Sequence, residues 1–247
     1  MKLYVFDCGH AHLPDLSHLT PDRNVGRPVT IPILTFLIEH PKGLVLFDTG
    51  VDTDQADDPV LEVSPELRVD RQMRRLGYDP GDVRYVILSH LHLDHVGCMP
   101  LFPDATFIVR RQELRAAWWP DAYERGYDFE ALLKTRRLKY LQPGADEAFD
   151  VFGDGSLVCI DTKGHTEGHQ SLVVDLPQSG RVVLVGDAAQ VLENFTDLVP
   201  PGVCWNSQLA VEAMERLRHL EANGAQVILG HEMSALAGLR LAPEYYE

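Results

Sequence analysis

The sequence predicts an α/β fold, because short strands occur in both halves of the chain and helical segments lie between them. Several short apolar runs, rich in β-branched residues, end in polar or turn residues, which is typical of strands. Apolar residues also recur three to five positions apart between residues 207 and 223, as on the buried face of a helix. The chain has 247 residues, of which 45% are hydrophobic, so it can bury a sizeable core, and we expect one domain over residues 1–247.

The predicted strands fall into two sets. Those of the first half cover residues 3–6, 35–39, 44–47, 85–88 and 106–109, and those of the second half cover residues 157–160, 171–174, 182–185 and 227–229. One strand of the first half ends in Asp48-Thr49-Gly50, and one of the second half ends in Gly186-Asp187-Ala188. This similarity indicates that one type of β-unit is used twice.

Three segments are predicted to be helical. The clearest covers residues 207–223, with Gly224 as its stop signal. A second covers residues 65–76, where Ser64 and Pro65 suit the N-cap and the first helical position. The third covers residues 128–140.

The net charge indicates which classes of binding partner are favoured, and the cysteine content indicates the cellular compartment. The formal net charge of −15 disfavours a nucleic-acid groove and an anionic membrane surface, and favours a small-molecule substrate. The four cysteines are scattered without a C-x-x-C pair, so neither a disulfide framework nor a cysteine zinc site is indicated. With no signal-peptide pattern at the N-terminus and no long apolar run, we expect a cytoplasmic protein. The sequence does not fix the oligomeric state, and a homodimer is possible.

The densest chemical signal is the run His90-Leu91-His92-Leu93-Asp94-His95, which directly follows a predicted strand. A loop that carries three imidazoles and a carboxylate in this spacing can supply two adjacent metal sites. The alternative, surface or helix-capping histidines, is disfavoured because clustered imidazoles repel one another when they are protonated.

The remaining ligands should come from neighbouring strand ends at the same edge of a sheet. His165, Asp187 and His231 each follow a predicted strand and each have glycine immediately before them, which permits a close backbone approach. Taken singly, each of these three residues could equally be an ordinary core or turn residue. Together with the histidine run they indicate one metal centre.

Imidazole and carboxylate ligands suit zinc, and a shell without thiolates leaves coordination positions open. A water bridging two such metals becomes hydroxide near neutral pH, so hydrolysis is the expected chemistry, with Asp94 a candidate to steer the water or accept its proton. Manganese, iron and cobalt remain alternatives to zinc, because affinity alone does not select the metal.

The ordered motifs H-x-H-x-D-H, G-H-T-x-G-H, G-D and G-H resemble those of the metallo-β-lactamase superfamily over nearly the whole chain. The resemblance implies a four-layer αββα sandwich that binds two zinc ions. Residues His90, His92 and His165 would hold one ion, Asp94, His95 and His231 the other, and Asp187 would bridge both. It also implies that Asp48, in Asp48-Thr49-Gly50, orients ligands, while we interpret His169 as structural.

Within this superfamily the sequence is most similar to the quorum-quenching N-acyl-homoserine lactonases, which open a lactone ring. The similarity rests on residues 2–9, residues 37–50 and the segment Gly164-His165-Thr166-Glu167-Gly168-His169-Gln170-Ser171-Leu172. It implies attack of a metal-bridging hydroxide on the lactone carbonyl. A redox di-iron centre is disfavoured. The related oxygen reductases have an H-x-E-x-D pattern, in which Glu stands where this sequence has His92.

One position departs from these lactonases. A tyrosine stands three residues after the bridging Asp in the familiar members, whereas Gln190 stands here. Gln190 can donate a hydrogen bond to the substrate but cannot act as a phenolic acid, so Tyr123 or Tyr127 is a candidate for that role, and Phe195 is a candidate pocket residue. Hydrolysis of another lactone, ester or thioester, and a non-catalytic metal-binding sensor or scaffold, therefore stay open as alternatives.

Overall fold

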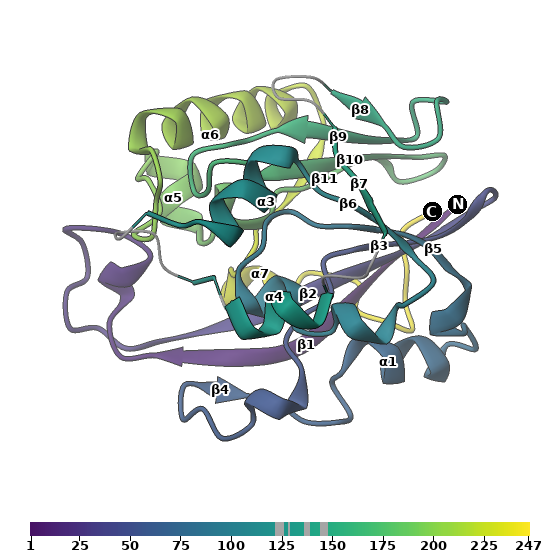
Figure 1. The fold of residues 1–247 in the computed structure, drawn as a ribbon. Helices are drawn as coiled ribbons and strands as arrows, with labels where there is room; N and C mark the ends of the chain where they lie inside the picture. Colours follow the sequence, from purple (N-terminus) through teal and green to yellow (C-terminus); the bar gives the residue numbers. More distant parts are fainter. Residues whose placement is uncertain (122–125, 128, 136–138, 144–147) are drawn as a thin grey trace.

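The computed structural model describes residues 1–247 except 122–125, 128, 136–138 and 144–147, and its described strands form two sheets that face each other (Figure 1). The first sheet has the spatial order β4 (Leu61–Glu62), β1 (Lys2–Leu13), β2 (Val29–His40), β3 (Gly43–Phe47), β5 (Val83–Ile87), β6 (Thr106–Ile108) and β7 (Lys139–Leu141). The second has the order β12 (Gln226–Ile228), β11 (Gly180–Leu184), β10 (Gln170–Leu176), β9 (Leu157–Asp161) and β8 (Phe149–Asp150).

Helices flank the two sheets, most of them on the outer faces. They are α1 (Val69–Arg75), α2 (Leu93–Val96), α3 (Arg111–Trp118), α4 (Phe129–Thr135), α5 (Leu192–Asp197), α6 (Ser207–Ala222) and α7 (Met233–Leu236). In Figure 1, α5 and α6 lie beside the second sheet, and α1 and α4 lie on the opposite side of the molecule. Short 3-10 turns include Gly186–Ala188, directly after β11.

Three of the four apolar clusters found among the described residues define the layers. Successive residues of a strand point to opposite faces, so Leu3 and Val5 of β1 pack between the sheets, whereas Tyr4 and Phe6 pack against the outer helices. The core between the sheets joins β1, β2, β3, β5 and β6 to β9, β10, β11 and β12. The outer core of the first sheet includes residues of α1, α3 and α4, and that of the second sheet includes Met214 of α6. The order helix, sheet, sheet, helix confirms the predicted αββα sandwich.

The strand directions bring distant loops to one edge. Strands β3, β5 and β6 are parallel neighbours in the first sheet, and β11 and β12 are parallel neighbours in the second. Parallel strands end at the same edge of a sheet, so the residues that follow them meet there. Asp48 follows β3, the histidine run follows β5, and Asp187 and His231 follow β11 and β12 closely.

Two of the predicted helices need correction. The segment 65–76 is helical only over Val69–Arg75, because Arg68 is extended (φ −62°, ψ 136°) and its guanidinium binds Asp70 at 2.6 Å. Ser64 and Pro65 therefore lie in a turn before the helix and do not cap it. In the segment 128–140, α4 covers Phe129–Thr135, and residues 128 and 136–138 lie outside the described part of the chain. Residues Lys139–Leu141 form β7, because they hydrogen-bond to the edge of β6.

The other predicted elements are confirmed. Each predicted strand overlaps an observed one, although the segment 35–39 is only part of the twelve-residue β2. The predicted helix 207–223 corresponds to α6, whose first turn is capped by Asn206, since its side chain accepts a hydrogen bond from the backbone of Leu209. No helix in the described part of the chain has the length and apolar character needed to cross a membrane.

Candidate metal centre

The side chains predicted as metal ligands lie together at the edge where the parallel strands end. All are buried except Asp94, whose side chain is 32% exposed. They form three overlapping groups in which the potential ligand atoms lie within 4.8 Å of one another: His90, His92 and His165; His90, His95 and Asp187; and Asp94, His95 and His231.

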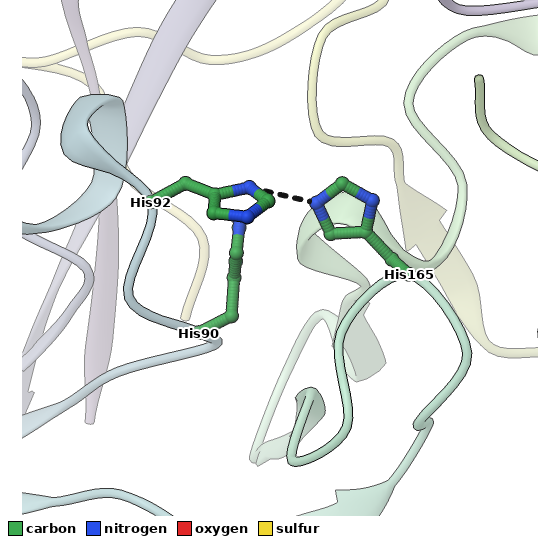
Figure 2. A group of neighbouring side chains, drawn as sticks. All are labelled: His90, His92 and His165. Carbon is green, nitrogen blue, oxygen red and sulfur yellow. Dashed lines mark hydrogen bonds between the residues drawn. The ribbon is translucent and has the colours of Figure 1, made fainter. Parts of the chain in front are cut away.

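The first group is formed by three imidazoles from two loops. His90 and His92 follow β5, and His165 follows β9. Figure 2 shows the rings of His92 and His165 facing each other, with His92 Nδ1 3.0 Å from His165 Nε2. These two nitrogens cannot both keep their lone pairs so close without a proton or a cation between them.

Asp187 lies between the first and the last of these groups. Its Oδ2 is 3.4 Å from His165 Nε2, and its Oδ1 is 3.2 Å from His95 Nε2 and 3.0 Å from His231 Nε2. Each carboxylate oxygen therefore faces a different set of imidazoles, so this one side chain contacts both halves of the cluster.

Backbone carbonyls set the orientation of two of the rings. The Nδ1 of His165 donates a hydrogen bond to the carbonyl oxygen of Val203 at 2.6 Å, and the Nδ1 of His231 donates to that of Pro32 at 2.8 Å. Because a carbonyl oxygen can only accept, the proton must be on Nδ1 in both rings. When these rings are neutral, as metal ligands must be, their Nε2 lone pairs face the cluster.

Asp48 orients a third ring, as predicted. Its backbone is left-handed (φ 59°), and its carboxylate accepts hydrogen bonds from the backbone of Ser89 at 2.7 Å and from His95 Nδ1 at 2.8 Å. The carboxylate thus ties His95 to the start of the histidine run.

His169 has a structural role. The backbone N–H of Asp187 donates to His169 Nε2 at 3.0 Å, and the Nδ1 of the ring pairs with Thr162 Oγ1 at 2.9 Å. Burial lowers the pKa of His169 to about 3, so Nε2 stays free to accept. The metal-ligand groups found among the described residues do not include His169.

Glycine is required before two of the ligands. Gly186 has a φ of +55°, and a Cβ there would lie 2.9 Å from the Cβ of Ser89. At Gly164 a Cβ would lie 2.3 Å from the backbone nitrogen of Ala210, so a side chain would push the His165 loop off α6.

The buried polar atoms of the cluster fit a divalent metal. His90 Nε2, His95 Nε2 and Asp187 Oδ1 have no hydrogen-bond partner among the described residues. Leaving such atoms buried and unsatisfied is costly, whereas a cation among them would satisfy all three. Burial also lowers the pKa of His90 and His92 well below the usual value, which keeps these imidazoles in the neutral form that binds metals.

The structure places the residues predicted to bind substrate in different surroundings. Gln190 lies at the cluster, where its Nε2 donates to Asp187 Oδ2 at 2.6 Å. Phe195 packs instead into the apolar core beneath α5 and α6 and is only 5% exposed, so the structure gives it a core role. Tyr123 lies outside the described residues. Tyr127 packs edge-on against the ring of His92, and its hydroxyl donates to Glu113.

Two supporting residues were not predicted from the sequence. Ser89 binds Asp48 and also lies 3.0 Å from His90 Nδ1 through its hydroxyl. Glu113, on α3, accepts hydrogen bonds from residues of both histidine-bearing loops. Ser89 could have been found from its place beside His90, whereas Glu113 carries no motif.

The sandwich and its histidine and aspartate cluster define a class of metal-binding protein. The sequence profile of the metallo-beta-lactamase superfamily matches residues 30–231, and the chain belongs to this superfamily.

Relatives that match the chain over its full length indicate its group within the superfamily. The chain is 36% identical over 263 aligned positions to the N-acyl homoserine lactonase AttM of Azorhizobium caulinodans, covering 100% of this chain and 99% of that protein. It is 30% identical to the N-acyl homoserine lactonase AiiA of Bacillus thuringiensis subsp. kurstaki, over 99% of this chain and 98% of that one. These similarities place the chain in the N-acyl homoserine lactonase group.

A solved structure agrees in three dimensions. It is an N-acyl homoserine lactone hydrolase with the product N-hexanoyl-L-homoserine bound at its catalytic metal centre. The two chains superpose with a TM-score of 0.86 at 30% identity, over 99% of this chain and 98% of that one.

Proposed function

We propose that this protein is a metal-dependent hydrolase that opens the lactone ring of N-acyl homoserine lactones. The observation that carries the proposal is the position of Asp187, whose two oxygens face two different sets of imidazoles. Relatives that match the chain over its full length are lactonases of this kind, which supports the choice of substrate.

The donor set suggests two zinc ions, which would share Asp187. One would be held by His90, His92 and His165, and the other by Asp94, His95 and His231. Nitrogen and carboxylate donors suit zinc, while manganese, iron or cobalt would also fit. When bound, the two ions supply a hydroxide nucleophile near neutral pH and polarise the carbonyl group of the substrate.

Asp94 is the residue that we assign to proton transfer. It is the exposed member of the cluster, and its Oδ2 lies 3.5 Å from both His95 Nε2 and His231 Nε2. A bond forms between the water oxygen and the lactone carbonyl carbon, and the ring C–O bond breaks. Because Oδ2 faces the ligand group, the other carboxylate oxygen of Asp94, Oδ1, would accept the proton of the water and pass it to the departing ring oxygen, which yields the N-acyl homoserine.

Gln190 stands where the familiar lactonases have tyrosine, and it does not carry an acidic proton. Its Nε2 hydrogen bond to Asp187 indicates a different task, which is to hold the shared carboxylate in place. We therefore assign proton transfer to Asp94, and we assign to Gln190 the task of orienting Asp187.

The test is hydrolysis of N-acyl homoserine lactones of increasing chain length by metal-analysed protein, with the ring-opened product detected by mass spectrometry. We expect ring opening that a chelator abolishes and that added metal restores. A thioester and a simple ester serve as competing substrates. Turnover of these without turnover of any lactone would replace the proposed substrate, and no turnover by fully metallated protein would favour a sensor or scaffold.

A further inference from the structure

Glu113 is a fully buried carboxylate outside the ligand set, with 0% exposure, in the first turns of α3. Its two oxygens bind different loops. Oε1 accepts from the backbone N–H of Leu91 at 2.9 Å, and Oε2 accepts from the backbone N–H of Gly168 at 3.0 Å and from Thr166 Oγ1 at 2.6 Å. Burial raises the pKa of Glu113 to about 7, and its hydrogen-bond donors oppose that rise.

The residues that Glu113 binds are next to one particular group of histidines. Leu91 separates His90 from His92, and Thr166 directly follows His165. Glu113 therefore joins the two loops that carry the three-imidazole group of Figure 2.

The contact between α3 and the second loop is close. A Cβ at Gly168 would lie 2.2 Å from the backbone nitrogen of Glu113, so only glycine lets the loop approach the helix this far. On the other side, Tyr127 donates to Glu113 Oε1 at 3.1 Å and packs against His92, with ring centroids 4.9 Å apart. Glu113 thus holds both loops and also Tyr127, the ring that packs against His92.

The opposite group is anchored elsewhere. His95 is held by Asp48, and His231 by the carbonyl of Pro32. The hydrogen bonds found for Glu113 in the described part of the chain do not reach Asp94, His95 or His231.

We propose that Glu113 is a positioning residue that sets the spacing of His90, His92 and His165 and thereby the metal affinity of this group alone. The inference rests on the proposed metal-dependent function. Residues that orient metal ligands typically change metal affinity by about 10-fold to 100-fold when they are replaced.

The test is a measurement of the zinc affinity of the whole protein in the absence of substrate. Apo-protein is titrated with zinc against a chromophoric chelator, which gives two stepwise dissociation constants. For Glu113→Gln, whose amide cannot accept from every donor, we expect one constant to weaken about 10-fold to 100-fold while the other changes less than about twofold. Saturating zinc should then restore lactone hydrolysis.

The matched control is Asp70→Asn, which neutralises another buried carboxylate. Asp70 lies on α1 and pairs with Arg68, the residue before the helix. We expect its two constants to stay at the wild-type values. If Glu113→Gln does not fold, Thr166→Val removes a single donor to Oε2 and should weaken the same constant several-fold.

Unchanged constants in the foldable variants, or equal losses in Glu113→Gln and Asp70→Asn, would overturn the inference. Because no substrate is present in the titration, this result is independent of whether the protein hydrolyses lactones. Failure of the lactone assay with intact zinc affinity would instead count against the proposed function.

Discussion

The side-chain amide of Gln190 lies 2.6 Å from the carboxylate of Asp187, with Nε2 donating to Oδ2. The same Oδ2 lies 3.4 Å from His165 Nε2, while Oδ1 faces His95 and His231. Gln190 therefore holds the one carboxylate that both halves of the cluster share. The resemblance to lactonases described above implies a tyrosine at this position, so Gln190 departs from that pattern.

Replacing Gln190 with Ala should lower kcat/KM for lactone hydrolysis about 10-fold to 100-fold while two metals stay bound. A hydrogen bond to a charged group is worth about 1.5–3 kcal/mol, and each 1.4 kcal/mol is a factor of ten in rate. Steady-state kinetics together with metal analysis measures both effects. If kcat/KM is unchanged for every lactone tested, Gln190 does not act on the reacting site.

Replacing Gln190 with Tyr introduces the phenol of the familiar lactonases. We expect metal content to stay constant and turnover or chain-length preference to change, because a phenol can donate a proton that an amide cannot. Kinetics over the lactone series tests this. Identical profiles for this variant and the wild type would remove position 190 from the substrate pocket.

Replacing Asp187 with Ala should release both metals and reduce kcat/KM by at least about 10³-fold, since metal catalysis contributes several kcal/mol. The physical reason is that each oxygen of Asp187 faces a different set of imidazoles. Inductively coupled plasma analysis of the purified variant gives its metal content. Asp187→Asn is the control that keeps the shape without the charge, and wild-type metal content in Asp187→Ala would contradict the shared role.

His40 predicts a pH dependence of stability that is separate from the metal centre. It is buried and stacks on Phe152, and its Nδ1 accepts the backbone N–H of Lys42 at 3.1 Å while Nε2 donates to Ser156 Oγ. Burial lowers the pKa of His40 below its usual value of about 6.5, despite the opposing charge of Asp154.

Because the unfolded chain binds the proton more tightly at this residue, the contribution of His40 to stability is present above about pH 6.5 and is lost as pH falls below it. We expect the free energy of unfolding to exceed that of His40→Gln by about 1 kcal/mol at pH 7.5, the value of one hydrogen bond, and by less at pH 5.5. Denaturant titrations at both values give the difference. A constant difference between the two proteins would show that His40 does not titrate in this way.

The strands and the ligands could be predicted from the sequence because each leaves a local signal. A strand shows a short β-branched run, and the metal cluster shows four donor residues within residues 90–95. The glycines before His165 and Asp187 added a second local signal, which the structure explains by close backbone contacts.

The elements that could not be predicted depend on distant partners. Helix α3 has only eight residues, too few for a sequence pattern to identify it reliably, yet it places Glu113 against loops that are far away in the sequence. Strand β7 is an edge strand whose identity comes from its pairing with β6. Phe195 follows the site loop in sequence, but α5 turns it into the core.

The central claim, a lactonase that needs two metals held by one shared carboxylate, is tested most directly by adding zinc back to chelator-stripped protein. Lactone ring opening is followed as a function of metal equivalents per chain. We predict no turnover by the metal-free protein and full turnover only as two equivalents are bound. Full turnover at one equivalent, or in the metal-free protein, would contradict the account.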